Sequence, residues 1–131
     1  MREVFDGEEV VARLIRQDDI KEGLSFFSKD FESLQVGAWE HSKDTILPRH
    51  IHKIVPRTFQ RTNETLVVMF GEVDATIYSL DGDALDSFTV HKGEILILLN
   101  CGHGYYVHDG TQVIEIKNGP YPGAEQDRER F

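Results

Sequence analysis

Four residues of the types that bind divalent metals recur in the central part of this 131-residue chain. His50 and His52 are separated by one residue, so in a β-strand their imidazoles would project from the same face. Glu64 begins another predicted strand, and His103 lies between two further predicted strands. Two imidazoles from one strand, joined by a carboxylate and a third imidazole, would form a compact site for one divalent transition metal, namely Fe, Mn, Ni, Cu or Zn.

The elements that must position these residues are predominantly β-strands. Short apolar and β-branched runs alternate with turn signals such as Asp109-Gly110, a pair typical of tight hairpins. One short helix is predicted at residues 20–27, where apolar residues have helical spacing after the N-capping pair Asp18-Asp19. Many short strands separated by turns predict an all-β sandwich or small barrel. The predicted strands are residues 10–16, 34–40, 45–52, 64–70, 74–79, 85–91, 94–99, 105–108 and 111–117.

Composition limits the classes of partner. The formal net charge of -9 argues against nucleic acid and anionic membranes as partners. The chain has a single cysteine and therefore cannot form an internal disulfide, which favours the reducing cytoplasm. No apolar run approaches the roughly 20 residues that a membrane-spanning helix needs. We therefore expect a cytoplasmic protein that acts on a small molecule.

The order of the chemically active residues resembles the two signature motifs of the cupin superfamily. Residues 64–71 run from Glu64 through an apolar strand to Gly71, like the second half of the first cupin motif. Gly93-Glu94 followed by His103 is similar to the second motif. The resemblance covers about residues 34–117. Cupins usually place only a few residues between the second histidine and the glutamate, whereas residues 53–63 intervene here and predict a long loop.

This resemblance implies a fold and a metal centre. It implies one cupin domain over residues 1–131, with a strand–helix extension (1–33), a double-stranded β-helix or jelly-roll barrel (34–117) and an irregular tail (118–131). It also implies a mononuclear metal held by His50, His52, Glu64 and His103. The segment from Glu115 to Tyr121, with the pattern E-x-K-x-G-P-Y, is similar to the ending of small cupin metalloproteins associated with bacterial surface polysaccharide genes.

A cationic segment lies next to the predicted metal site. No acidic residue occurs between Asp44 and Glu64, although the chain as a whole is acidic. We predict that arginines of this segment bind a carboxylate or phosphate of the substrate, and that a tyrosine hydroxyl also contacts it. These residues are Arg49, Arg57, Arg61 and Tyr105. The alternative is that the arginines are solvated or paired with acids of the same or a neighbouring subunit, and that the tyrosine belongs to the core.

Three functions remain open from the sequence. The first is a metal-dependent enzyme of dioxygenase or isomerase type, acting on a small anionic or carbohydrate-derived substrate at open coordination positions. The second is a metal-free enzyme, because residues 48–53 resemble part of the cupin ketoisomerases that act on nucleotide-linked deoxysugars. In that case His50 and His52 would be the general acid and base. The third is a non-catalytic ligand-binding module.

A homodimer is predicted from the strand at residues 94–99. Leu96 and Leu98 are apolar on one face of this strand, and Ile95, Ile97 and Leu99 are apolar on the other. A strand that is apolar on both faces needs a second cover, for which the partner subunit is the simplest candidate. The alternative is that the N-terminal segment provides this cover.

Overall fold

Three antiparallel sheets account for the regular structure in a computed structural model of residues 1–131. The five-stranded sheet has the order β1-β2-β8-β5-β10, the three-stranded sheet has the order β7-β6-β9, and β3 and β4 form a separate pair. The strands are β1 (Arg2–Asp6), β2 (Glu9–Ile15), β3 (Gly23–Phe26), β4 (Gly37–Glu40), β5 (Glu64–Phe70), β6 (Glu72–Tyr78), β7 (Ala84–His91), β8 (Ile95–Leu98), β9 (Gly102–Val107) and β10 (Gln112–Lys117). The all-β prediction is confirmed.

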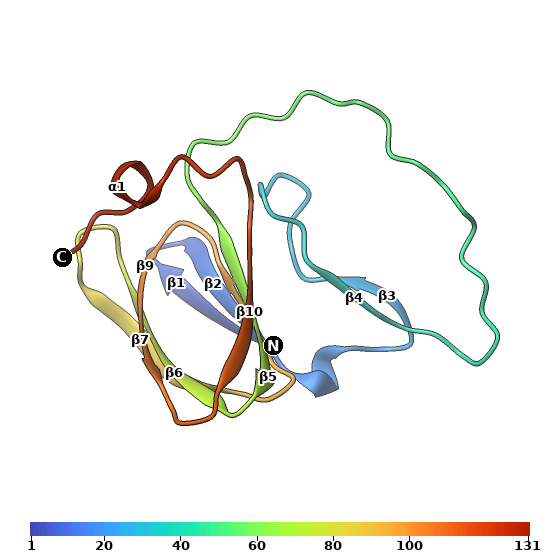
Figure 1. The fold of residues 1–131 in the computed structure, drawn as a ribbon, viewed down its shortest axis with the longest axis horizontal. Helices are drawn as coiled ribbons and strands as arrows, with labels where there is room; N and C mark the ends of the chain where they lie inside the picture. The colour runs from blue at the N-terminus through green and yellow to red at the C-terminus, as the bar shows by residue number, and fades with distance from the viewer.

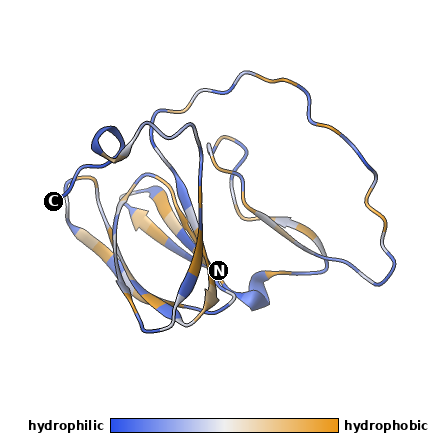
Figure 2. Ribbon diagram, in the orientation of Figure 1, coloured by the Kyte–Doolittle hydropathy of each residue, from blue (hydrophilic) through white to orange (hydrophobic).

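The two larger sheets pack against each other across one apolar core (Figure 1). In β6, buried and half-buried residues alternate, as expected for a strand with one face toward a core. Apolar residues are concentrated on the strands of these two sheets (Figure 2). The core residues are Val4, Val11, Ala12, Leu14, Leu66, Val68, Val73, Ala75, Ile77, Val90, Leu96 and Leu98.

The helices are two single turns, η1 (Gln17–Asp19) and α1 (Ala124–Asp127). Neither is long and apolar enough to cross a membrane. The helix predicted at residues 20–27 is wrong. Gly23 has a φ of 89°, outside the helical region, and residues 23–26 pair as β3 with β4. Leu24 and Phe26 also fit a two-residue period, so the pattern was ambiguous, and Asp19 instead accepts a hydrogen bond from the backbone N–H of Arg16 at 2.8 Å.

The N-terminal strands are part of the main sheet rather than an extension outside it. The strand predicted at residues 10–16 is found as β2, which pairs with both β1 and β8. Its core residues Val11, Ala12 and Leu14 are almost completely buried. The N-terminal residues therefore contribute directly to the apolar core.

The strand predicted at residues 45–52 is absent. Residues 41–60, called the arm from here on, contain no helix or strand. The arm curves away from both large sheets before the chain returns to β5 (Figure 1). Pro48 and Pro56 lack the N–H groups that a sheet ladder needs, and no strand lies beside the arm to pair with it.

The outer face of β8 is covered by the chain itself. Ile97 is fully buried in a second apolar cluster with Ile15 and Leu99. Phe27 and Val36, from the segment that connects β3 to β4, pack against this cluster. The N-terminal part of the chain therefore covers the face of β8 from which the dimer contact was predicted.

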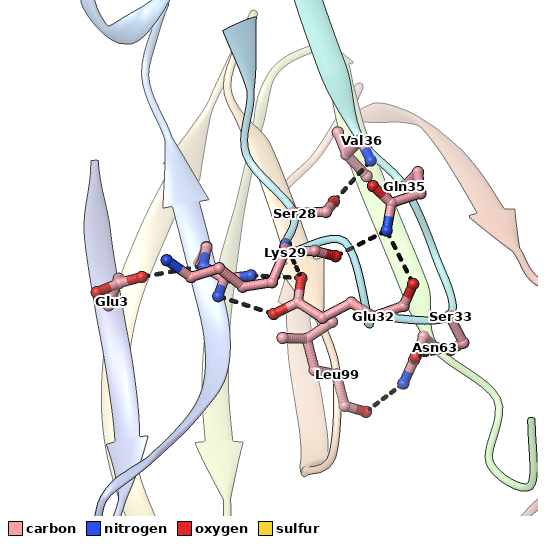
Figure 3. A network of polar contacts seen from close by, with 10 residues as sticks. Glu3, Ser28, Lys29, Glu32, Ser33, Gln35, Val36, Asn63 and Leu99 are labelled. Carbon is pink, nitrogen blue, oxygen red and sulfur yellow. Dashed lines mark hydrogen bonds and ion pairs between the residues drawn. The ribbon is translucent and has the colours of Figure 1, made fainter.

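A polar network fixes this covering segment and reaches the start of β5 (Figure 3). The buried guanidinium of Arg13 donates to both carboxylate oxygens of Glu32 at 2.8 Å and to Glu3 at 3.0 Å. Ser33 donates to the side chain of Asn63, whose amide donates to the carbonyl of Leu99 at 2.8 Å. Because the buried charge of Arg13 must be paired, its bonds to Glu32 and Glu3 fix the position of the covering segment. The network holds the residue immediately before Glu64 in place.

Candidate functional site

The centre of the candidate site is the buried carboxylate of Glu64, the first residue of β5. Only 6% of this residue is exposed. Lys117 lies directly opposite in the β5–β10 register, and its ammonium is 3.1 Å from Oε2 of Glu64. The Tyr105 hydroxyl donates to Oε1 at 3.2 Å. These two partners compensate the carboxylate for its loss of water.

His103 approaches Glu64 from the opposite sheet. His103 and Tyr105 are two residues apart in β9, so both side chains point to the same face. Nε2 of His103 is 3.5 Å from Oε1 of Glu64. Burial lowers the pKa of His103, although the Glu64 charge works in the opposite direction. The imidazole is therefore neutral at neutral pH and able to accept a proton.

Lys117 joins two carboxylates at the edge of the five-stranded sheet. Besides Glu64, its ammonium contacts Glu115 at 2.8 Å, two residues earlier in β10. Burial works to lower the pKa of Lys117, but hydrogen bonds to Glu115 and Glu64 outweigh it, and the pKa is raised. Lys117 thus stays charged and pairs with both Glu64 and Glu115.

A cavity of about 970 Å³ opens onto these side chains. Strands β5, β9 and β10 form one part of its wall, and residues 79–82 form another. The remaining wall is residues 127–131, where Phe131 packs edge-on against Tyr78 with ring centroids 5.3 Å apart. Thr62 donates a hydrogen bond to Asp127 and holds this segment at the cavity. The tail predicted as irregular therefore forms part of the cavity wall and includes the helical turn α1.

The charged groups at the cavity include guanidinium groups without a carboxylate partner. Arg61, Arg128 and Arg130 line the cavity and form no ion pair within the chain. Among the lining acids, Glu64 and Glu115 are paired with Lys117, and Asp127 accepts from Thr62. Asp81 and Glu129 complete the charged lining. The lining therefore contains three guanidinium groups and three carboxylates without an ion-pair partner.

The predicted site residues divide into two groups. Glu64, His103, Tyr105 and Arg61 come together at the cavity, whereas His50, His52, Arg49 and Arg57 lie on the exposed arm. The His50 and His52 rings are 5.1 Å apart, and Nδ1 of His50 is 3.0 Å from the carbonyl of Pro48. Arg57 donates to the carbonyl of Val55 at 3.3 Å. The contacts of these arm residues are local.

The donors gathered at the cavity are too few for the implied metal. A protein-bound transition metal takes three or more protein ligands, whereas the imidazole of His103 at the cavity lies close to one carboxylate, that of Glu64. No three His, Cys, Asp or Glu side chains meet in a group that could hold a metal ion. The Lys117 ammonium also contacts the second oxygen of Glu64. In this arrangement the residues do not fit a mononuclear metal, and its predicted ligands His50 and His52 lie elsewhere.

Four residues at the cavity were not identified as site residues from the sequence. Lys117 and Glu115 were noted only within the E-x-K-x-G-P-Y pattern, and Arg128 and Phe131 were not noted at all. A signal for the first pair exists, because two alternating charged residues in an otherwise apolar strand point to the same face. The contribution of the tail has no such signal, since it depends on how the chain end packs.

Cys101 also lines the cavity, two residues before His103. Burial raises the pKa of its thiol to about 12. The side chain is therefore protonated at neutral pH and packs against the core as a small apolar group, rather than serving as a nucleophile.

Comparisons with protein-family models, with curated proteins and with solved structures each found no match. The argument for function therefore rests on the geometry of the cavity.

Proposed function

We propose that this protein is a small cupin-like enzyme of isomerase type that binds an anionic or carbohydrate-derived molecule in the cavity and transfers a proton within it. The observation that carries the proposal is the His103–Glu64 pair on the cavity wall, with Nε2 and Oε1 3.5 Å apart. The two facing sheets support a jelly-roll arrangement for the fold, and the single cysteine supports a cytoplasmic location.

The proposed chemistry assigns a different task to each side chain. His103 is the more exposed member of the pair and contacts the substrate. Its neutral imidazole removes a proton from a carbon next to a carbonyl, and returns that proton to the neighbouring carbon or oxygen. Glu64 stabilises the imidazolium that forms in between, while Tyr105 and Lys117 hold the carboxylate in place. The reaction is an isomerisation and consumes no oxidant.

The arginines at the cavity without an ion-pair partner support contact with an anionic group of the substrate. Arg61 and Arg128 offer planar guanidinium groups that can bind a carboxylate with two parallel hydrogen bonds. The other lining residues are mostly polar, which suits a molecule rich in hydroxyl groups. A carboxylated sugar combines both features.

A nuclear magnetic resonance titration tests this binding. D-glucuronate should shift the amide signals of residues 102–105 and Lys117, and neutral D-glucose should shift them less. Exchanging both cavity arginines in Arg61→Gln/Arg128→Gln should weaken glucuronate binding about ten-fold or more, because a charge-assisted contact is lost. Arg49→Gln, an arginine on the arm, is the matched control and should bind normally. Equal affinity of both sugars, or shifts confined to other regions, would contradict the proposal.

A metal-dependent cupin is the second candidate. The observation that favours it is the Glu64–His103 separation of 3.5 Å, a distance at which two ligands of one metal also lie. The arm that carries His50 and His52 ends beside Arg61 and Thr62 at the cavity rim. Elemental analysis decides between the candidates. One equivalent of metal in the wild type that is lost in His50→Ala/His52→Ala would support the metal site, and equal metal content in both proteins would refute it.

A further inference from the structure

The arm is an unusual segment, because it presents apolar side chains to solvent over its whole length. Ile51 is 93% exposed and Ile54 is fully exposed, and Ile46 is exposed to a similar degree. The hydrogen bonds of residues 41–60 all stay within the arm. Loops of this length without regular structure are uncommon in compact domains and usually have a function.

The accessible surface area of one chain is larger than that expected for a compact monomer. The chain exposes 9660 Å². A compact monomer of 15.0 kDa is expected to expose about 7,000 Å². The excess is roughly 2,600 Å² per chain, which corresponds to the area that one partner loses in a large obligate dimer, roughly 1,000–2,500 Å². The excess exposed area of a single chain is therefore of the size expected for a subunit separated from its dimer partner.

A receiving surface for the arm lies on the outer face of β5 and β10. Ile114 is opposite Val67 and Ile116 is opposite Thr65 in the register, so these residues share the face that points away from the core. Ile114 and Ile116 are about half exposed, as is Met69 on the same face of β5. The segment that connects β3 to β4 packs on the β2–β8 half of the sheet, whereas Ile114, Ile116 and Met69 on the β5–β10 half stay partly exposed.

The charges of the chain favour a second copy as the occupant. The arm contains four of the 14 cationic residues and one of the 23 acidic residues, Asp44. The rest of the chain therefore carries 10 cationic and 22 acidic residues, a formal charge of -12. A cationic, apolar arm thus complements the acidic, apolar body of an identical chain. Since each chain has both surfaces, one two-fold axis lets both arms dock at once.

We propose that the arm, residues 41–60, docks on the outer face of β5 and β10 of a second copy of this chain and forms a reciprocal homodimer. The contact replaces the dimer predicted at β8, where the apolar face is already covered. It does not depend on the chemistry proposed for the cavity.

Sedimentation velocity on purified protein at micromolar concentration tests this proposal. The wild type should sediment with twice the 15.0 kDa mass of one chain. Ile51→Glu/Ile54→Glu should raise the dimer Kd about 100-fold or more and yield a monomer, since charges replace buried apolar groups on both arms. Ile114→Glu/Ile116→Glu should have the same effect from the receiving side. Circular dichroism checks that each variant is folded.

The matched control is Phe31→Glu, because Phe31 is 87% exposed but lies outside the arm. This variant should remain a dimer. Trypsin should cleave the arm after Lys53 and Arg57 in the monomeric variants much faster than in the wild type. A monomeric wild type would overturn the proposal. So would a dimer that persists in the arm variant, or one that Phe31→Glu dissociates equally.

Discussion

Replacing Lys117 by methionine should destabilise the protein through the carboxylate that it leaves behind. Methionine keeps much of the side-chain volume but removes the ammonium that contacts Glu64 at 3.1 Å. Only 7% of the Glu64 side chain and 18% of the Lys117 side chain are exposed, so water cannot replace the lost partner efficiently. The variant therefore keeps a buried negative charge with one fewer donor.

The magnitude follows from these contacts. Removing one partner of a fully buried ion pair costs roughly 3–5 kcal/mol, and an exposed pair contributes about 1 kcal/mol or less. The Tyr105 hydroxyl still donates to Glu64 in the variant, so we expect a loss of about 2–3 kcal/mol. For a chain of 131 residues this corresponds to a fall in Tm of roughly 7–11 °C.

Urea denaturation and calorimetry at pH 7, at one fixed protein concentration, measure this loss. Lys43→Met is the matched control on the exposed arm and should change stability by about 0.5 kcal/mol or less. Adding Glu64→Gln to Lys117→Met should recover about 1 kcal/mol, because it removes the unpaired charge. The reasoning is refuted if Lys117→Met costs no more than Lys43→Met, or if the double variant is less stable than Lys117→Met alone.

Two further predictions concern the turns and the opposite end of the sandwich. Gly71 and Gly110 both have a φ of 71°, but a Cβ at Gly71 would lie 2.5 Å from Oγ1 of Thr111, whereas Gly110 has open space. Urea denaturation should show that Gly110→Ala lowers the free energy of unfolding by about 1–2 kcal/mol, because of backbone strain. Gly71→Ala should lower it by about 1–3 kcal/mol more, because its Cβ also clashes with Thr111. Equal losses in the two variants would contradict this packing. Hydrogen bonds from Thr89 and His108 lower the pKa of Asp74 below its ordinary value of 3.8. The stability advantage of the wild type over Asp74→Asn should thus be complete above that value and disappear as pH falls below it, and a pH-independent difference would refute the assignment.

Alternation of apolar residues was sufficient to predict most strands of the two larger sheets. β5 has the predicted bounds and β10 begins one residue later than predicted, because one face of each strand meets the core and the other does not. The Asp109-Gly110 turn also forms, with a hydrogen bond from the Thr111 N–H to the carbonyl of His108 at 3.3 Å. Yet β9 and β10 lie in different sheets. A turn signal indicates that the chain reverses, but the partners of the flanking strands depend on the whole core.

The candidate site was predictable to a similar extent. The order of Glu64 and His103 placed them together, and the structure confirms that they meet across the two sheets. The contact between Glu64 and Lys117 depends on the register of β5 and β10, which no local pattern specifies. The predicted neighbourhood of His50 and His52 required residues 45–52 to be a strand, and that strand has no partner in the chain.

Hydrogen–deuterium exchange into candidate substrates tests the proposed proton transfer by His103 most directly. Aldoses, ketoses and uronates are incubated with the protein in D₂O, and proton magnetic resonance follows the C–H signal next to the carbonyl. The account predicts that the wild type removes this signal from at least one of these compounds, that His103→Gln slows the loss about 100-fold or more, and that His91→Gln, an exposed histidine of β7, does not. Absence of exchange with every compound, or equal exchange by His103→Gln and wild type, would contradict the account.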